Sequence, residues 1–127
     1  MKLLIYAMVG GALGSGARHL VNVGMGRWLG VGGFPWWTLS INVTGCLLMG
    51  VLIEVLALKL QGSTDLRTLL ATGVLGGYTT FSAYSLDFAV LMQRHEHLQA
   101  ALYLIGSVAM SIAAIYAGLW LTRWLLT

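Results

Sequence analysis

The sequence predicts an all-α membrane protein: a single domain of 127 residues with four transmembrane helices, the third of them broken near its middle. Hydrophobic residues make up 58% of the chain and charged residues only 9%. Soluble domains carry about 25% charged residues, so this chain has too few charges to cover a surface that faces water. The mean hydropathy of +0.84 agrees. The solvent for most of this surface is therefore expected to be a lipid bilayer.

Four long apolar stretches give the expected spans. A helix rises 1.5 Å per residue, so about 20 apolar residues cross a bilayer. Stretches of this kind cover residues 3–23, 36–58, 66–92 and 98–126. Tryptophans lie near the predicted ends, where interfacial anchors are common. Glycine-rich or polar links separate the spans, at residues 30–35, 61–65 and 93–97.

The few polar clusters outside the spans exclude several classes of function. The seven basic residues are scattered, which argues against binding to nucleic acid. His95 and His97 alternate with Glu96 in a polar link, and with no third ligand evident this pattern favours a solvated loop over a metal site. Cys46 is the only cysteine, so no intrachain disulfide forms, and an apolar setting favours a small core residue over a nucleophile.

The number of basic residues is nearly the same on the two sides of the membrane, so it hardly favours either orientation of the chain. With four spans, one side holds Lys2, Lys59, Arg67 and Arg123. The other side holds Arg18, Arg27 and Arg94. Because the bias is so small, either one orientation wins by a narrow margin or the chain inserts both ways up. In the second case two copies could pair antiparallel, as the inverted repeats of larger transporters do.

The third span should not be a plain helix. Gly73, Gly76 and Gly77 are followed by Thr79 and Thr80 near its middle. Glycines and hydroxyls are poor choices for a helix that faces lipid, and non-helical backbone at membrane depth occurs only where protein or a cavity surrounds it. A local break would free backbone carbonyls, which bind alkali cations in broken-helix transporters. A continuous helix packed tightly through its glycines is the alternative.

Several segments together resemble a known family. Residues 76–85 read Gly-Gly-Tyr-Thr-Thr-Phe-Ser-Ala-Tyr-Ser, and residues 37–42 read Trp-Thr-Leu-Ser-Ile-Asn. Arg18 in the first span and Gly106-Ser107 in the fourth fit the same pattern. With the length and the span count, these segments resemble the small bacterial fluoride channels, the Fluc or CrcB family.

This resemblance implies a function and an assembly. It implies a passive channel, multi-pass in the bacterial inner (cell) membrane, that lowers cytoplasmic fluoride. It implies an antiparallel, dual-topology homodimer with a structural sodium ion, which the main-chain carbonyls of Gly76 and Thr79 would hold. The paired phenylalanines of the family fall on Phe81 and Tyr84. Arg18, Thr38 and Ser40 are expected to have a vestibule or structural role.

Fluoride must exchange its water for neutral donors and for the positive edges of aromatic rings, because a charged lining binds too tightly to release the ion. Asn42 lies about 9 Å into the second span and serves either as such a donor or as a bond between helices. Gln99, Tyr103, Ser107 and Ser111 form one polar stripe on the fourth span, although single serines usually serve packing. The expected pore-lining residues are Asn42, Thr80, Phe81, Ser82, Tyr84, Tyr103, Ser107 and Ser111.

Two positions depart from the family pattern. Tyr84 stands where the family usually has phenylalanine, and Ala83 stands where it usually has threonine. The tyrosine could add a donor or crowd the path, and the alanine removes one hydroxyl.

Two other functions compete with a channel. A small multidrug exporter has the same size and span count, but proton coupling needs a carboxylate deep in the membrane. Glu54 and Asp87 are better placed near helix ends. A structural membrane protein without transport would need neither the break nor the polar stripe. The chain is not expected to be an enzyme, since no nucleophile, base and orienting group can be assembled from it.

Overall fold

The computed structural model describes residues 1–30 and 32–127, and every regular element in this part of the chain is a helix. Two long helices, α1 (Lys2–Leu29) and α2 (Trp36–Lys59), come first. A third, interrupted helix follows in the pieces α3 (Thr64–Leu66), η1 (Arg67–Leu75), α4 (Gly76–Tyr78) and α5 (Phe81–Gln93). The last helix is α6 (His97–Leu126).

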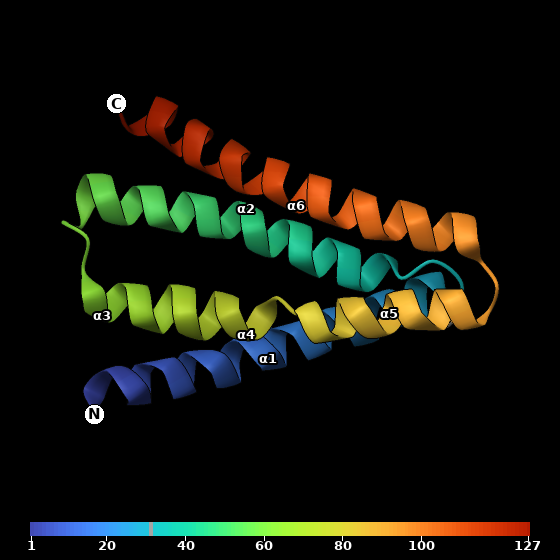
Figure 1. The fold of residues 1–127 in the computed structure, drawn as a ribbon. Helices are drawn as coiled ribbons and strands as arrows, with labels where there is room; N and C mark the ends of the chain where they lie inside the picture. The colour runs from blue at the N-terminus through green and yellow to red at the C-terminus, as the bar shows by residue number, and fades with distance from the viewer. Residues whose placement is uncertain (31) are drawn as a thin grey trace.

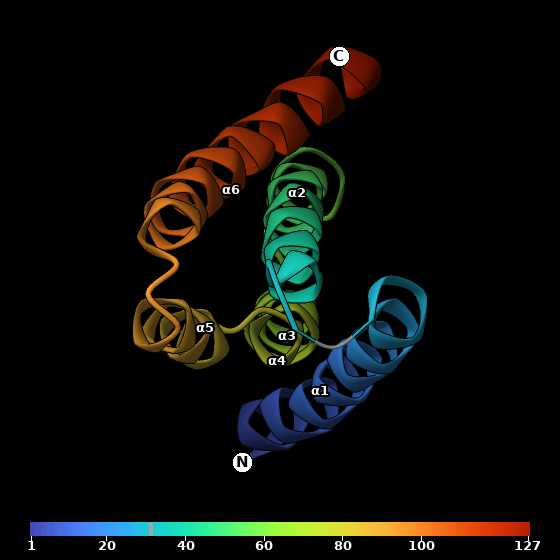
Figure 2. The same ribbon diagram turned by 90° about the vertical axis from the view of Figure 1, so that its right-hand side faces the viewer.

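The four helical segments run up and down beside one another. Both termini and the link between α2 and α3 lie at one end of the bundle, and the other two links lie at the opposite end (Figure 1). Viewed along the bundle, α2 stands between α6 and the α3–α4 segment, while α5 lies on the side of α6 (Figure 2). The most extensive packing joins α2 to α6 and α1 to η1.

Glycines allow the backbones of α1 and the third helix to approach closely. A Cβ atom on Gly73 would stand 2.8 Å from the Gly10 Cα, and one on Gly77 would stand 2.6 Å from the Gly11 carbonyl oxygen. Such distances exclude any larger residue without a shift of one helix. This contact, which uses small residues as membrane helices commonly do, places the first half of the third helix against α1.

The second close contact joins α2 to α6. A Cβ atom on Gly118 would stand 2.9 Å from the amide nitrogen of Val51, and Gly50 meets the backbone of α6 in the same way. About one turn further along, the Arg123 Nε donates to the Glu54 Oε1 at 2.6 Å. The Glu54 side chain is buried, whereas Arg123 is exposed. Glu54 lies near the end of α2, as expected, and the tertiary structure buries its carboxylate against a paired cation.

The helix bounds agree with the four expected spans, although α1 extends six residues beyond residue 23. Two helices, α2 and α6, are long and apolar enough to cross a membrane by length and composition. The third segment divides into shorter pieces, and α1 carries Arg18, His19 and several glycines.

An exposed ion pair closes the terminal end of the bundle. The Lys2 Nζ lies 3.1 Å from the Asp65 Oδ2, and both side chains are largely exposed. The hydrogen bond to Asp65, with its charge, raises the pKa of Lys2 above its ordinary value. Exposed pairs of this kind contribute little to stability, so packing rather than this pair holds α1 against the third helix.

Candidate functional site: a broken helix beside a polar pocket

The third helix breaks at Thr79 and Thr80, as the sequence predicts. Both residues have extended backbone, with φ −79° and ψ 154° at Thr79 and φ −150° and ψ 118° at Thr80. The glycine pair before them stays helical in α4. Gly76 and Gly77 therefore do not form the break, and Gly77 serves the close contact with α1.

Local hydrogen bonds end one helix and begin the next. The Thr79 side chain donates to the Leu75 carbonyl at 2.9 Å, and this carbonyl also accepts the Thr79 backbone N–H. The Thr80 hydroxyl then accepts the Ala83 N–H at 3.1 Å, which makes Thr80 the N-cap of α5. The helix before the break is wound more widely, since the Gly76 N–H reaches back five residues to the Ala71 carbonyl.

Asn42 satisfies the backbone that the break exposes. Its Oδ1 accepts the Thr80 N–H at 2.8 Å, and its Nδ2 donates to the Thr80 carbonyl at 3.1 Å. Thr80 has extended backbone, and in a sheet a neighbouring strand would bond both its N–H and its carbonyl. Here the Asn42 side-chain amide makes both of these hydrogen bonds. At membrane depth such groups have no water to pair with, so α2 stabilises the break directly. Asn42 forms the interhelical bond considered for it, and one of its two amide hydrogens remains for another acceptor.

The break leaves the last carbonyls of the preceding helix without their helical donors, and those of Gly76 and Thr79 are among them. In a continuous helix the Thr80 N–H would reach the Gly76 carbonyl, but this N–H donates to Asn42. The Ala83 N–H would likewise reach the Thr79 carbonyl, but it donates to the Thr80 hydroxyl. Gly76 and Thr79 are the residues that the resemblance names as sodium ligands, and the sodium site itself stays a prediction.

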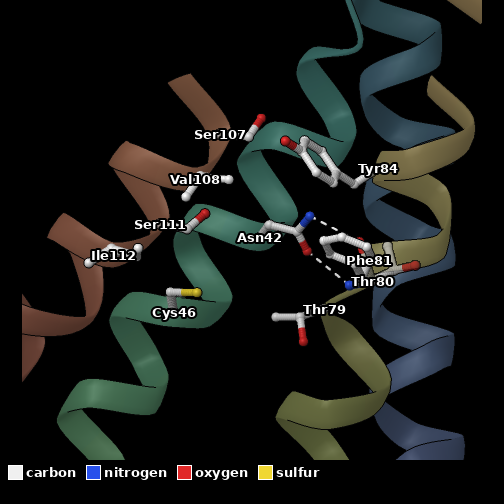
Figure 3. Close-up of a pocket in the computed structure, with 10 residues that line it drawn as sticks. All are labelled: Asn42, Cys46, Thr79, Thr80, Phe81, Tyr84, Ser107, Val108, Ser111 and Ile112. Atoms are coloured by element: carbon white, nitrogen blue, oxygen red, sulfur yellow. Dashed lines mark hydrogen bonds between the residues drawn. The ribbon is translucent and has the colours of Figure 1, made fainter. Parts of the chain in front are cut away.

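A pocket of about 300 Å³ adjoins the break. Side chains from α2, the break, α5 and α6 meet around it, and the Asn42 amide points toward the break (Figure 3). None of the ten described lining residues carries a charge. They are Asn42, Cys46, Thr79, Thr80, Phe81, Tyr84, Ser107, Val108, Ser111 and Ile112.

Ser107 is the most available donor in this lining. Its side chain is 4% exposed, and its hydroxyl oxygen has no hydrogen-bond partner among the described residues. An unpaired buried hydroxyl is costly, so a site of this kind favours a bound group that accepts its hydrogen. Ser111 lies one turn further along α6 and faces the same pocket (Figure 3).

The hydroxyls of the two tyrosines among the expected pore residues donate to protein acceptors and not into the pocket. Tyr84 is buried, and its O–H donates to the Leu104 carbonyl of α6 at 2.7 Å. Tyr103 is fully buried, and its O–H donates to the Asp87 Oδ2 at 3.0 Å. Tyr84 still lines the pocket with its ring, whereas Tyr103 packs in the core behind it.

These rings belong to a row of aromatic side chains. Phe81 contacts Tyr84 with ring centroids 5.4 Å apart, and Tyr84 contacts Tyr103 at 5.2 Å. Tyr103 in turn meets Phe34 edge-on at 5.5 Å. Phe81 ends the row, and its ring is 76% exposed at the rim of the pocket.

The other expected site residues lie around this centre. The Ser82 hydroxyl is 3.3 Å from the Thr80 hydroxyl, outside the pocket lining. Thr38 is buried in α2, and the Ser40 carbonyl accepts the Thr44 hydroxyl. Arg18 lies half-buried on α1, away from the pocket.

Three further residues in the wall of the pocket were not predicted from the sequence: Cys46, Val108 and Ile112. Cys46 was expected to be a core residue, but it is half-buried and its side chain faces the pocket (Figure 3). It lies one turn after Asn42 on the same face of α2, which is the signal that could have found it. Val108 and Ile112 each follow a pocket serine in α6 and supply apolar wall.

Several known proteins similar to this chain share a name. The chain matches the family described as CrcB-like protein, Camphor Resistance (CrcB), over residues 5–119. It is 51% identical to the Fluoride-specific ion channel FluC of Chelativorans sp. (strain BNC1), over 97% of this chain and 98% of that protein. It is 50% identical to the protein of the same name from Rhodopseudomonas palustris (strain BisB5), over 95% of each chain. A third relative of that name, from Sphingopyxis alaskensis, is 47% identical over 97% of each chain. The chain belongs to the CrcB-like protein family.

Proposed function

We propose that this protein is a membrane channel that passes fluoride passively down its gradient. The observation that carries the proposal is the uncharged pocket beside the broken helix, which gathers a free buried hydroxyl, an amide and a phenylalanine ring. The name shared by the full-length relatives supports the choice of ion.

The pocket suits a small, strongly hydrated anion. The Ser107 hydroxyl and the remaining Asn42 N–H can each donate to it, and the rim of Phe81 carries the positive edge of the ring quadrupole. Because no lining residue is charged, the ion would be held weakly enough to leave again. Tyr84 contributes its ring alone, since its hydrogen is bonded to Leu104.

The membrane arrangement is part of the proposal. The four helical segments would span the bacterial inner membrane, and two copies would pair antiparallel. Support comes from the narrow charge bias between the two sides and from the exposure of the Phe81 ring. A phenylalanine exposed beside a polar pocket is well placed to meet a second copy, and each subunit then completes the wall of the other's path.

The freed carbonyls of Gly76 and Thr79 suit a structural sodium ion. Their usual hydrogen-bond donors bind Asn42 and the Thr80 hydroxyl, so these two oxygens are available to a hard cation. Two copies would supply four such oxygens around one ion. The ion would hold the two breaks together and would take no part in conduction.

Liposome efflux tests the function. Purified protein is reconstituted, a potassium ionophore is added, and fluoride and chloride release are compared. We expect rapid fluoride release with little chloride release. Release of both ions at similar rates, or of neither from a folded protein, would contradict a fluoride channel.

Phe81→Ile in the same assay tests the pocket. The substitution keeps an apolar side chain but removes the ring edge, so fluoride release should fall to the level of empty liposomes while the protein elutes unchanged from a sizing column. Trp124→Leu, at an exposed site near the end of α6, is the matched control and should conduct normally. Full flux through the Phe81 variant would remove this residue from the ion path.

The structure gives no support to proton-coupled export. Glu54, the most buried acid among the described residues, is paired with Arg123 and lies far along α2 from the pocket. Asp87 accepts the Tyr103 hydroxyl in the core of the opposite end.

A further inference from the structure

The link between α5 and α6 is a rigid turn with a histidine in an unusual conformation. The Glu96 N–H donates to the Leu91 carbonyl and the His95 N–H to the Met92 carbonyl, each at 3.0 Å. These two bonds form a Schellman motif, which places the residue after the helix C-cap in the left-handed region. That residue is His95, with φ 60°. Glycine is the favoured residue there, and histidine is among the few other residues that adopt this conformation with some frequency.

A methionine sulfur completes a group of soft ligands at this turn. The His97 Nδ1 lies 3.5 Å from the Met92 Sδ. A metal ion bonded to nitrogen at about 2.0 Å and to sulfur at about 2.3 Å, with a tetrahedral angle between them, separates these atoms by about 3.5 Å. The observed distance therefore suits two ligands of one ion.

The second histidine lies within reach of the same ion. The rings of His95 and His97 have centroids 6.0 Å apart and are inclined at 72°. Two imidazoles on one metal ion each keep their ring centre about 3 Å from it, so a tetrahedral angle places the two centres about 5 Å apart. A rotation of the exposed His95 side chain that moves its ring by about 1 Å would close this difference. All three side chains are exposed and the turn is held by backbone bonds, so an ion could enter without rearrangement of the fold.

We propose that Met92, His95 and His97 form a binding site for monovalent copper. The set of two imidazoles and one thioether is soft, and thioether ligands select Cu(I) over zinc, magnesium or calcium. The described residues hold no group of three His, Cys, Asp or Glu side chains that would suit a harder ion. The site lies at the opposite end of the bundle from the termini and does not depend on the proposed fluoride function (Figure 1).

The charges around the turn are mixed. Glu96 lies between the histidines, and one of its carboxylate oxygens is buried without a hydrogen-bond partner in the described part of the chain. A nearby cation would compensate this carboxylate. Arg94, which is exposed on the same turn, opposes the binding of a cation.

A bound ion would tie the last turn of α5 to the first turn of α6. These two helices carry Phe81 and Tyr84 on one side of the pocket and Ser107 and Ser111 on the other. The expected physical consequence is a higher unfolding temperature with metal than without it, because a ligand that binds only the folded state stabilises it.

Calorimetric titration with Ag(I), a redox-inert probe for Cu(I), tests the site. The full-length protein carries Cys46→Ala, since the thiol would bind the probe, and chloride is replaced by nitrate. We expect one ion per chain. Met92→Leu and His97→Gln should each weaken binding at least about tenfold, the lower limit for losing even an indirect contributor to a metal site. His95→Asn should do the same while keeping the turn, because asparagine tolerates the left-handed conformation.

Met110→Leu is the matched control, since Met110 is also exposed but lies on α6, well away from the turn. A second measurement uses methionine labelled at the methyl carbon, where only the Met92 signal should shift with Ag(I). Equal binding by the Met92 and Met110 variants, or a stationary Met92 signal, would overturn the site. In that case the 3.5 Å contact is only an N–H···S hydrogen bond.

Discussion

At the scale of single residues, Asn42 is the residue on which the site depends most. From α2 it bonds both the N–H and the carbonyl of Thr80 at the break, and it lines the pocket with one amide hydrogen left to donate. Its two considered roles, interhelical bond and anion donor, are compatible because a side-chain amide has more than two hydrogen-bonding positions. The structural role also explains why a polar side chain is kept at this depth.

Asn42→Asp adds a negative charge at this position while keeping the size and shape of the side chain. The carboxylate still accepts the Thr80 N–H but repels an anion. Two unit charges 4 Å apart at an effective dielectric of about 20 interact by about 4 kcal/mol. This corresponds to roughly a thousandfold lower rate of fluoride efflux. The measurement is liposome efflux at neutral pH.

Asn42→Ala is the comparison, since it removes the bonds without adding charge. We expect a destabilisation of about 1–3 kcal/mol, the usual cost of leaving buried polar groups unpaired, and a smaller loss of flux than in the aspartate variant. An aspartate variant that conducts as well as the parent would leave Asn42 with the interhelical role alone.

Tyr84 is the clearest departure from the family pattern, and its hydroxyl joins α5 to α6. Tyr84→Phe removes only the bond to Leu104. We expect a loss of stability of about 1 kcal/mol, as for a typical single hydrogen bond, with fluoride flux retained because the ring stays. Thermal unfolding in detergent and efflux from liposomes check the two parts.

Tyr116→Phe is the control, because this tyrosine is exposed near the end of α6. A Tyr84→Phe variant that is stable but no longer conducts would show that the hydroxyl itself serves the ion path.

At the scale of elements, glycine contacts and one ion pair decide how the helices approach. Gly50 and Gly118 bring the backbones of α2 and α6 together, and Glu54 with Arg123 closes the same interface about one turn away. The carboxylate is buried and the guanidinium is exposed, so the loss of each partner should have a different effect.

Arg123→Gln should lower the unfolding temperature more than the double variant Glu54→Gln, Arg123→Gln. The single change leaves a buried carboxylate without its cation, whereas the double change leaves two neutral amides that can bond to each other. Both variants are compared by thermal unfolding in the same detergent. Equal losses in the two variants would show that the ion pair does not contribute to the interface.

At the scale of the whole molecule, the proposed antiparallel assembly depends on the near-equal number of basic residues on the two sides. Because four basic residues face three, a few added charges should set one orientation. A pair of opposite variants, one with two lysines added in the link at residues 61–65 and one with two added at residues 93–97, should each insert in a single orientation.

Each biased variant expressed alone should give little fluoride efflux, and coexpression of the two should restore it, because only opposite orientations can form the antiparallel pair. Efflux and cross-linking in membranes measure this. A biased variant that conducts fully by itself would show that the channel does not need two orientations.

The helical class, the approximate extent of most helices and the place of the break could be predicted from the sequence alone. Composition and the length of apolar stretches decide the first two, because lipid admits few alternatives to the helix. The break follows from the two adjacent threonines in an apolar segment, whereas the glycines before them stay helical. These signals are local, so they can be read along one chain.

Only the tertiary structure decided how each polar group is used. It committed the hydroxyls of Tyr84 and Tyr103 to protein acceptors, left that of Ser107 free, and turned Cys46 toward the pocket. It also paired Glu54 with a residue 69 positions away. Such choices depend on which helices meet and at what distance. Hydrogen bonds and ion pairs between distant segments leave no periodic trace in the sequence, whereas burial against lipid does.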